Sequence, residues 1–532
     1  MRYFLLFIIT IVFYFLSSGY VYSQHTFLKL NKDALHRYEK HIYCNSENIH
    51  TSVKPYLKDE LGNTDSIDHD HIIETNSGLI DNFLNHSPLT IDRNPFKVIT
   101  DPVLSSVFSY GSDPEKYSYD LAIGFSAYRS YRKFSFITNL IQAYSVFPGY
   151  ISENADTKGI FPHWGTRYKK NGNIYSKFIT TGYFSWSPYS IISDRVGMNM
   201  QAGIDKNFWG DGYRSLLLSD NSNAYPFLKL TLNVWKLKYV VLYSLMQDVD
   251  YHANTDSLIN KYATSHLLSW NIVRRINLYL FESVVWSNNG YPYSRGFDVN
   301  YVNPVIFFRP VEFTVGDPSP DNVLMGGGTR IKVSQCTHLY GQVMLDEFNL
   351  NEIKKNEGWW GNKYGFQIGM KTYRFLSVKD LFMLLEYNHV RPYTYSHVKS
   401  TENYGNSFES LAHPAGANFK EVINVLRYDH NRFSVINKFV FLSSGQDSSA
   451  VSLGGNIYKS YTKRPDDYGH RTLQGVRTDI IFNEIKIAFL VNPQYDLSLE
   501  TGVRIRNERS DIASDTDTYV FFGLRTLLYN DE

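Results

Sequence analysis

The chain has 532 residues, and its 53 Lys and Arg residues nearly balance its 52 Asp and Glu residues, for a formal net charge of +1. This balance argues against binding to nucleic acid through bulk charge, and we expect no nucleic-acid partner. The two cysteines exclude a disulfide-built scaffold and a cysteine-rich zinc site. Aromatic residues make up 16% of the chain, with 42 Tyr and 35 Phe, as in membrane barrels whose rings settle at the two membrane–water boundaries.

Residues 1–23 have the three-part pattern of a secretory signal peptide. Arg2 provides a positive start, Tyr3–Leu16 is uncharged and apolar, and Val21 and Ser23 occupy the −3 and −1 positions of a cleavage site. The apolar stretch is too short to span a bilayer of about 30 Å. We therefore expect export and cleavage, with a retained membrane anchor as the alternative.

Residues 24–99 lack a strand rhythm and are expected to form an extension, either periplasmic or lodged in the lumen as a plug. Asn31 is positioned to cap a short helix that includes Asp33 and Glu39. The region from Asp65 to Thr75 has the polar composition of a loop.

From residue 100 to 532, apolar and polar residues alternate with a period of two. In Tyr495–Arg506, for example, Leu499, Val503 and Ile505 share one face, and charged residues, a serine and a glycine take the other. Phe227–Trp235 and His338–Asp346 repeat the pattern. No later run approaches the roughly 20 apolar residues of a spanning helix. A chain with a mean hydropathy of −0.31 can still cross a membrane as a closed sheet. Each strand then has an apolar side that faces lipid and a polar side that faces the lumen. The sequence predicts an all-β fold, an outer-membrane antiparallel β-barrel.

About 18 strands are predicted, and tight turns alternate with long links between them. The strands are expected to begin near residues 100, 118, 133, 177, 190, 224, 237, 264, 275, 322, 336, 363, 379, 419, 431, 475, 494 and 517. The long links are 146–176, 204–223, 249–263, 287–321, 349–362, 392–418, 445–474 and 508–516. Outer-membrane barrels have short periplasmic turns and long external loops, so we expect these links to be extracellular.

This topology puts Cys336 in a periplasmic turn, on the same side as the extension that contains Cys44. A Cys44–Cys336 disulfide is therefore one hypothesis, and two free buried thiols are the alternative. In the last strand, Val520, Phe522 and Leu528 are expected to face outward. Barrels of this kind often end on an aromatic residue read by the barrel-assembly machinery, but here a polar tripeptide follows Tyr529.

No motif requires catalysis, a cofactor or a metal. Gly326, Gly327 and Gly328 precede neither a helix pattern nor a Lys-Ser/Thr pair, so they do not indicate a phosphate-binding loop. His69 and His71 could ligate a metal, but histidines in a polar loop are more often simply solvated. We expect a protein that is not an enzyme.

The long links combine aromatic rings with charged groups and glycines. Such a set suits a sugar, whose C–H patches contact rings while fixed polar groups bind hydroxyls. The alternative is an interfacial aromatic girdle, with the arginines bracing the loops. The candidate polysaccharide-binding residues are Trp209, Asp211, Tyr213, Arg214, Arg309, Glu312, Trp359, Trp360, Arg391 and Tyr393.

Several of these stretches resemble the Wzi-like capsule assembly family, and the closest branch is the gliding motility (RemB) group of Bacteroidota. The matching stretches are 50–56, 203–239 with its core Asn207–Asp220, 303–313, 341–347, 359–365 and 411–419. The resemblance implies an outer-membrane barrel of 18 strands and a lectin-like role in holding capsular polysaccharide at the cell surface. For the gliding branch it implies a role in surface motility.

Residues and resemblance together predict a multi-pass outer-membrane barrel that binds extracellular polysaccharide through its outer loops. Its expected partners are outer-membrane lipid, the polysaccharide, the barrel-assembly machinery and gliding or secretion proteins. Two other functions remain open: a passive transport pore, and a structural partner of gliding or secretion machinery.

Overall fold

The structure is a computed structural model of the whole chain. It describes residues 27–45, 49–61, 67, 72–73, 77–93, 96–112, 116–131, 133–189, 196–249, 258–288, 296–303, 321–447 and 451–530. The predicted signal peptide and the candidate metal ligands His69 and His71 lie outside these residues.

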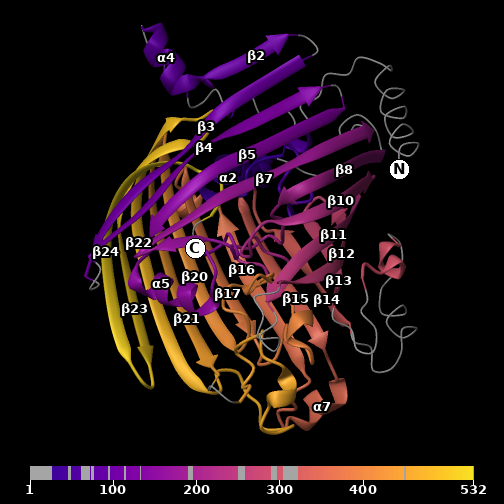
Figure 1. Cartoon of the computed structure of the whole chain (residues 1–532). Coiled ribbons are helices and arrows are strands. Elements are labelled where there is room, and N and C mark those ends of the chain that lie inside the picture. Colours follow the sequence, from indigo (N-terminus) through magenta and orange to yellow (C-terminus); the bar gives the residue numbers. More distant parts are fainter. Residues whose placement is uncertain are drawn as a thin grey trace.

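Eighteen antiparallel strands form a closed barrel within the described residues (Figure 1). Each strand pairs with the next along the chain, and β24 pairs with β3 to close the cylinder. This confirms the predicted fold class and strand number. The strands are β3 (Phe96–Gly111), β4 (Tyr117–Tyr131), β5 (Phe134–Val146), β7 (Ile174–Tyr189), β8 (Val196–Asp205), β10 (Tyr225–Val234), β11 (Leu237–Val249), β12 (Leu258–Val273), β13 (Ile276–Ser287), β14 (Asn322–Lys332), β15 (Thr337–Glu347), β16 (Lys363–Thr372), β17 (Leu381–Val390), β20 (Phe419–His430), β21 (Phe433–Gln446), β22 (Val476–Asn492), β23 (Leu497–Ser510) and β24 (Ser514–Thr526).

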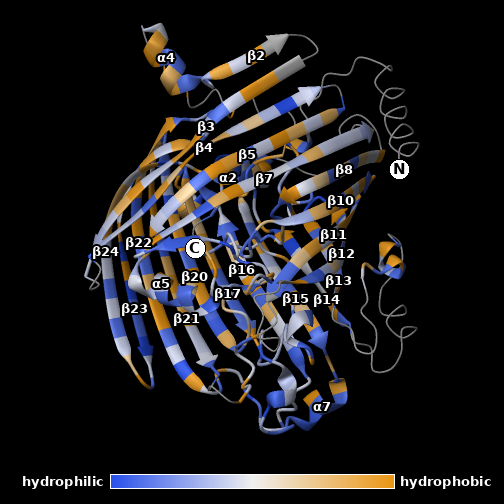
Figure 2. Ribbon diagram, viewed as in Figure 1, coloured by the Kyte–Doolittle hydropathy of each residue, from blue (hydrophilic) through white to orange (hydrophobic). Residues whose placement is uncertain are grey.

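Hydrophilic and hydrophobic residues alternate along the strands, as the sequence predicts (Figure 2). The exposed fractions of the side chains show that the apolar ones lie outside and many polar ones inside. On β23, Leu499, Val503 and Ile505 are exposed on the outside, whereas Glu500 is buried inside. On β15, Val343 is outside and Gln342 is buried. Among the described residues, no helix has the length and apolar character needed to cross a bilayer.

Tight turns gather at one end of the barrel and most long links at the other. The short-turn end includes the β10–β11, β12–β13 and β20–β21 connections, as predicted. The long-loop end carries α5 (Gly149–Lys158), α7 (Leu350–Lys355) and the links of β17–β20 and β21–β22. The 508–516 link is shorter than expected, because Arg509 pairs with Ser514 and makes this segment a tight hairpin.

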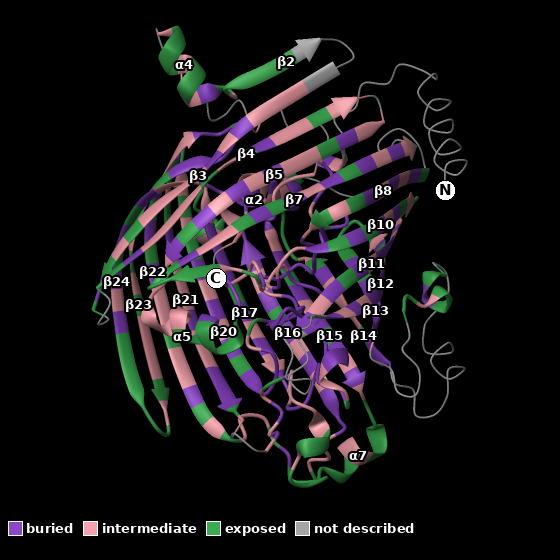
Figure 3. Cartoon of the chain, in the orientation of Figure 1, coloured by how far each residue is buried: buried purple, intermediate pink, exposed green. Residues whose placement is uncertain are grey.

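The segment 27–61 lies inside the barrel, where α2 (Lys32–Asn45) is followed by β1 (Val53–Lys54) and the 3-10 helix η1 (Lys58–Leu61) (Figures 1 and 3). Asn31 caps α2 as predicted, because its Oδ1 accepts hydrogen bonds from the backbone N–H groups of Asp33 and Ala34. Apolar residues of α2, among them Leu35 and Ile42, pack against inward-facing side chains of the wall. We call residues 27–61 the plug.

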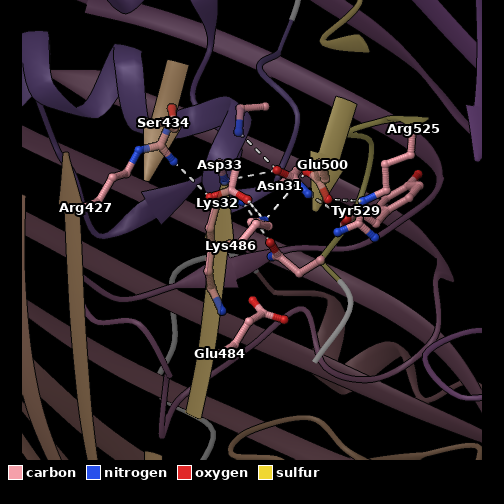
Figure 4. A network of polar contacts seen from close by, with 12 residues as sticks. Asn31, Lys32, Asp33, Arg427, Ser434, Glu484, Lys486, Glu500, Arg525 and Tyr529 are labelled. Carbon is pink, nitrogen blue, oxygen red and sulfur yellow. Dashed lines mark hydrogen bonds and ion pairs between the residues drawn. The ribbon is translucent and has the colours of Figure 1, made fainter. Parts of the chain in front are cut away.

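Polar contacts join α2 to the wall (Figure 4). Asp33 forms ion pairs with Arg427 of β20 at 2.9 Å and with Lys486 of β22 at 2.5 Å. Glu500 lies 3.7 Å from Lys486 and 3.2 Å from Arg525. These five side chains thus form one network of ion pairs that joins the plug to the wall.

Cys44, at the end of α2, is joined to Cys336 of the β14–β15 turn by a disulfide, with Cα atoms 4.4 Å apart. Tyr373 N–H donates to the Cys336 carbonyl beside this link. The two cysteines thereby connect the plug with the short-turn end.

The chain after β24 turns into the lumen instead of ending in the wall. Leu528 is buried, whereas the sequence places it on the outward face with Val520 and Phe522. The Tyr529 ring meets Trp164 edge-on at 5.0 Å, and its hydroxyl interacts with Thr181 and Asp205. These inward contacts replace the membrane-facing position expected from the alternation.

A segment made of a helix and a short strand lies at the rim of the short-turn end. Helix α4 (Gly78–Asn85) precedes β2 (Leu89–Arg93), which pairs only with β3 among the described strands. The remaining short elements are β6 (Lys169–Asn171), β9 (Phe208–Trp209), β18 (Gly405–Asn406), β19 (Glu409–Ser410), η2 (Val299–Val302), η3 (Phe375–Ser377), η4 (Ser400–Glu402) and η5 (Tyr461–Lys463).

Candidate functional site

The structure divides the candidate polysaccharide-binding residues between two places. Trp209, Asp211, Tyr213 and Arg214 lie in the lumen, and Trp359, Trp360, Arg391 and Tyr393 lie together at the long-loop end. Arg309 and Glu312 fall outside the described residues. The two groups are therefore considered separately.

The β8–β10 link folds into the lumen, although the sequence places 204–223 among the external loops. Its β9 pairs with β1 of the plug, with Trp209 opposite Val53. Trp209 and Asp211 are fully buried. The carboxylate of Asp211 accepts hydrogen bonds from the hydroxyls of Tyr43, at 3.0 Å, and Thr51, at 2.5 Å. This link is thus a second layer of the filling that occupies the barrel.

Tyr213 and Arg214 tie the same link to the wall. Their backbone N–H groups donate to the carboxylate of Glu386 at 2.7 and 3.0 Å. The Arg214 Nε lies 3.8 Å from Glu421, and Lys32 sits 3.7 Å from the centre of the Tyr213 ring. In this arrangement the four lumen residues hold the plug and the β8–β10 link together.

At the long-loop end, backbone hydrogen bonds join the β15–β16 link to the β21–β22 link in one unit. Trp360 N–H donates to the Asp467 carbonyl at 3.0 Å, and the N–H groups of Gly469 and His470 donate to the carbonyls of Glu357 and Gly358 at 2.8 and 2.9 Å. Gly358 has φ +71, and a Cβ there would lie 2.7 Å from the His470 carbonyl oxygen. The close approach of the two links therefore requires glycine at 358.

This unit presents four aromatic rings and one guanidinium group, which together we call the aromatic platform: Trp359, Trp360, Tyr461, Tyr468 and Arg464. The rings of Trp359 and Trp360 lie 5.9 Å apart, and Tyr461 lies 4.7 Å from Trp360. Arg464 lies 4.0 Å from the Trp360 ring centre and donates to Asp467. Tyr468 is 46% exposed, while both tryptophans are partly exposed. The platform thus offers aromatic surface beside a fixed guanidinium and a carboxylate.

Arg391 and Tyr393 bring the β17–β20 link against the platform. Arg391 donates to the Trp359 carbonyl at 3.3 Å. The Tyr393 ring is fully buried and meets Trp360 edge-on at 6.3 Å, and its hydroxyl donates to the Ser452 carbonyl at 2.9 Å. Three links are thereby joined, and Tyr393 supports the platform from below.

Burial raises the pKa of Tyr461 above its ordinary value of 10.0, and it raises that of Tyr393 as well. Both phenols are therefore neutral hydrogen-bond donors at physiological pH.

Sequence reasoning missed Tyr461, Arg464 and Tyr468, because their link has neither a strand period nor a matched motif. The available signal is composition, since three tyrosines, one arginine and two aspartates fall within residues 458–468. Within the described residues, no group of three or more His, Cys, Asp or Glu side chains could hold a metal ion.

Comparison with known proteins places the fold. No family model matches the chain, and no curated protein matches its sequence. Among solved structures, it is similar to Wzi of Escherichia coli, described as a carbohydrate-binding outer-membrane β-barrel involved in group 1 capsule assembly, with a TM-score of 0.54 and 12% identity over 93% of this chain and 98% of Wzi. Looser matches are OccK3 of Pseudomonas aeruginosa (TM-score 0.40, 8% identity, 80% of this chain and 94% of that one) and OccAB2 of Acinetobacter baumannii (TM-score 0.41, 9% identity, 81% and 97%). The chain has a Wzi-like fold, that of an outer-membrane β-barrel.

Proposed function

We propose that this protein binds polysaccharide at the cell surface through the aromatic platform, with the long-loop end facing outward. One observation carries the proposal: Trp359 and Trp360 lie beside Arg464 and Asp467 on two links joined by backbone hydrogen bonds. The exposed Tyr468 follows Asp467 in the chain. Rings in fixed positions stack on the C–H faces of sugars without losing much conformational freedom on binding. The guanidinium and the carboxylate supply directional partners for hydroxyls.

The filling of the lumen also favours binding over passive conduction. The plug and the β8–β10 link cross the barrel at the level of Trp209, which is fully buried. A pore needs a continuous water path, and here paired charges and apolar clusters occupy the described lumen. In this proposal the protein is not an enzyme, and its partners are membrane lipid, the polysaccharide and the barrel-assembly machinery that inserts it.

The test compares glycan binding by the purified wild type with that of a Trp359→Ala, Tyr468→Ala double variant. Loss of the two ring contacts is expected to weaken binding of the cell's own surface polysaccharide by roughly a hundredfold, about 2.7 kcal/mol. Tyr117→Ala is the matched control, because Tyr117 is an aromatic residue at the same end of the barrel and is 72% exposed.

Equal binding by the wild type and the double variant would contradict the proposed site. Steady single-channel conductance of the wild type in planar bilayers would favour a pore instead.

The resemblance to the gliding branch supports a finer version, in which the bound polysaccharide or a docked gliding or secretion protein serves surface motility. Deletion of the gene would then reduce spreading on agar together with polysaccharide retention. Lost spreading with normal retention would indicate a structural partner of the motility machinery.

A further inference from the structure

Helix α4 carries an apolar face that no described residue covers. Leu79, Ile80 and Phe83 are 84%, 53% and 58% exposed. At 100° per residue these three side chains fall within about 100° of the helix circumference. Asp81, Asn82 and Asn85 occupy the other side. The helix is therefore amphipathic, with its greasy side turned away from the protein.

The polar side of α4 is fastened to the rim of the short-turn end. Arg432, in the β20–β21 turn, forms a hydrogen bond with the Asn85 side chain at 2.5 Å. Asn492, at the end of β22, donates to the carbonyls of Phe83 and His86 at 2.8 and 3.0 Å. These bonds fix which side of the helix faces the barrel and leave the apolar side outward.

The rim at this end is itself a girdle of exposed apolar side chains. Phe433, which follows the Arg432 that holds α4, is 55% exposed. Trp235, Val273 and Leu376 are 73%, 49% and 76% exposed in or beside the other short turns. Such a girdle marks the boundary between membrane and water in barrels. The apolar side of α4 thus continues a surface that already meets lipid.

The strand after α4 extends this surface. Leu89 and Ile91 alternate along β2 and are 53% and 44% exposed. The segment of α4 and β2 lies at the rim, outside the lumen, at the top of Figure 1. Apolar surface is thereby contributed by two successive elements.

We propose that α4 and β2 rest on the membrane lipid at the short-turn end, with Leu79, Ile80 and Phe83 inserted among the acyl chains. The helix has a single charged residue, Asp81, and lacks the basic side chains that attract anionic headgroups. Zwitterionic phospholipid is therefore the lipid that it fits. The linker between plug and barrel would then be anchored at the membrane surface.

The experiment uses the full-length protein, with its disulfide intact, in vesicles of phosphatidylethanolamine and phosphatidylcholine. An environment-sensitive fluorophore is attached at Phe83→Cys or, as the matched control on the polar side, at Asn82→Cys. Phe433→Cys provides the reference for a position in the lipid girdle. The position 83 probe is expected to emit at shorter wavelength, to be quenched by brominated phospholipid and to resist aqueous iodide, as at position 433. The position 82 probe is expected to remain open to iodide.

Iodide quenching at position 83 equal to that at position 82 would overturn the proposal and leave the face for a soluble protein partner. Glycan binding is unaffected by either result, because the aromatic platform lies at the opposite end of the barrel. A labelled Phe83→Cys protein that fails to insert would be replaced by Leu79→Cys, on the same side of the helix, with the same two outcomes.

Discussion

Asp33 of the plug and Lys486 of the barrel wall form an ion pair at 2.5 Å, although 453 positions separate them in the chain. Arg427 contacts the same carboxylate at 2.9 Å. Ion pairs thus hold the plug against strands β20 and β22, which lie near the C-terminal end of the chain. The contribution of these ion pairs can be tested directly.

Asp33→Asn is expected to loosen the plug. Removal of the Asp33 negative charge leaves Lys486 and Arg427 with fewer acidic partners inside the lumen. Breaking a buried ion pair costs about 3–5 kcal/mol. Because the Asp33 side chain is 26% exposed, we expect the lower end, about 3 kcal/mol, or roughly a hundredfold more opening events in planar-bilayer recordings. Lys40→Met, on the same helix as Asp33, breaks a more exposed pair with Asp380 of the β16–β17 turn and is expected to leave the opening frequency near that of the wild type. Equal frequencies in Asp33→Asn and Lys40→Met would contradict the role of this ion pair.

Acid should have the same effect as Asp33→Asn. Burial opposes ionisation of Asp33, but Lys486 and Arg427 outweigh it and hold its pKa well below the ordinary 3.8. A lowered pKa stabilises the seated plug at pH values above 3.8, and this contribution disappears as the pH falls from 3.8 through the lowered pKa. Opening frequency should therefore rise in this acidic window in the wild type and change less in Asp33→Asn. An unchanged wild-type frequency between pH 7 and pH 2 would speak against this linkage.

Gly358→Ala is expected to disturb the aromatic platform without unfolding the barrel. Alanine at φ +71 is strained, and its Cβ would meet the His470 carbonyl; positions of this kind cost about 1–3 kcal/mol. Glycan affinity should fall several-fold, while the temperature at which the barrel unfolds in detergent stays constant. Gly172→Ala, which has φ +58 but open space around it, is the control for strain alone. Unchanged affinity in Gly358→Ala would show that binding does not depend on the locked links.

Lys261→Met is expected to destabilise the loops strongly. The Lys261 ammonium is fully buried and donates to Asp248 at 2.6 Å, to the Asn403 carbonyl and side chain, and to the Gly405 carbonyl. Its loss leaves the Asp248 carboxylate without its cation, at a cost of about 3–5 kcal/mol. Urea unfolding of the detergent-solubilised protein would measure this.

Lys170→Met provides the comparison, because it removes a solvent-exposed pair with Asp156, and exposed pairs contribute below about 1 kcal/mol. Similar effects of Lys261→Met and Lys170→Met would refute the structural weight assigned to Lys261.

The Cys44–Cys336 disulfide is expected in the mature protein from an oxidising compartment. Mass spectrometry of a non-reduced digest should recover the peptides of the two cysteines as one linked species, and reduction should separate them. Recovery of both as free thiols from freshly isolated membranes would rule the bond out.

The wall of the barrel could be read from the sequence because lipid and water impose opposite requirements on neighbouring residues. Leu499, Val503 and Ile505 are exposed where alternation placed them, and Glu500 is buried. The predicted start of β20 at 419 agrees with the structure, and that of β21 at 431 differs by two residues. Neither prediction needed tertiary information, since the periodicity and the turn residues are local.

The contents of the lumen could not be predicted in this way. Nothing local in Asn207–Ser215 tells that the link turns inward, because its place depends on β1, more than 150 positions earlier, and on Glu386. Trp359 and Trp360 are candidate binding residues in the sequence, but their partners Tyr461 and Arg464 lie about 100 positions away in an irregular link. Such pairings arise from barrel closure, which brings distant links to one end.

The last described residue also bears on the order of events during biogenesis. Asn530 accepts from the Lys32 N–H at 2.8 Å and donates to the Leu30 carbonyl at 3.2 Å and to Asp220 at 2.6 Å. The Asn530 side chain thus joins the start of α2 to the β8–β10 link, in which Asp220 lies 310 positions before Asn530. The plug precedes the barrel strands in the chain, but it can complete its docking only after β24 has joined the sheet, because Asn530 follows that strand.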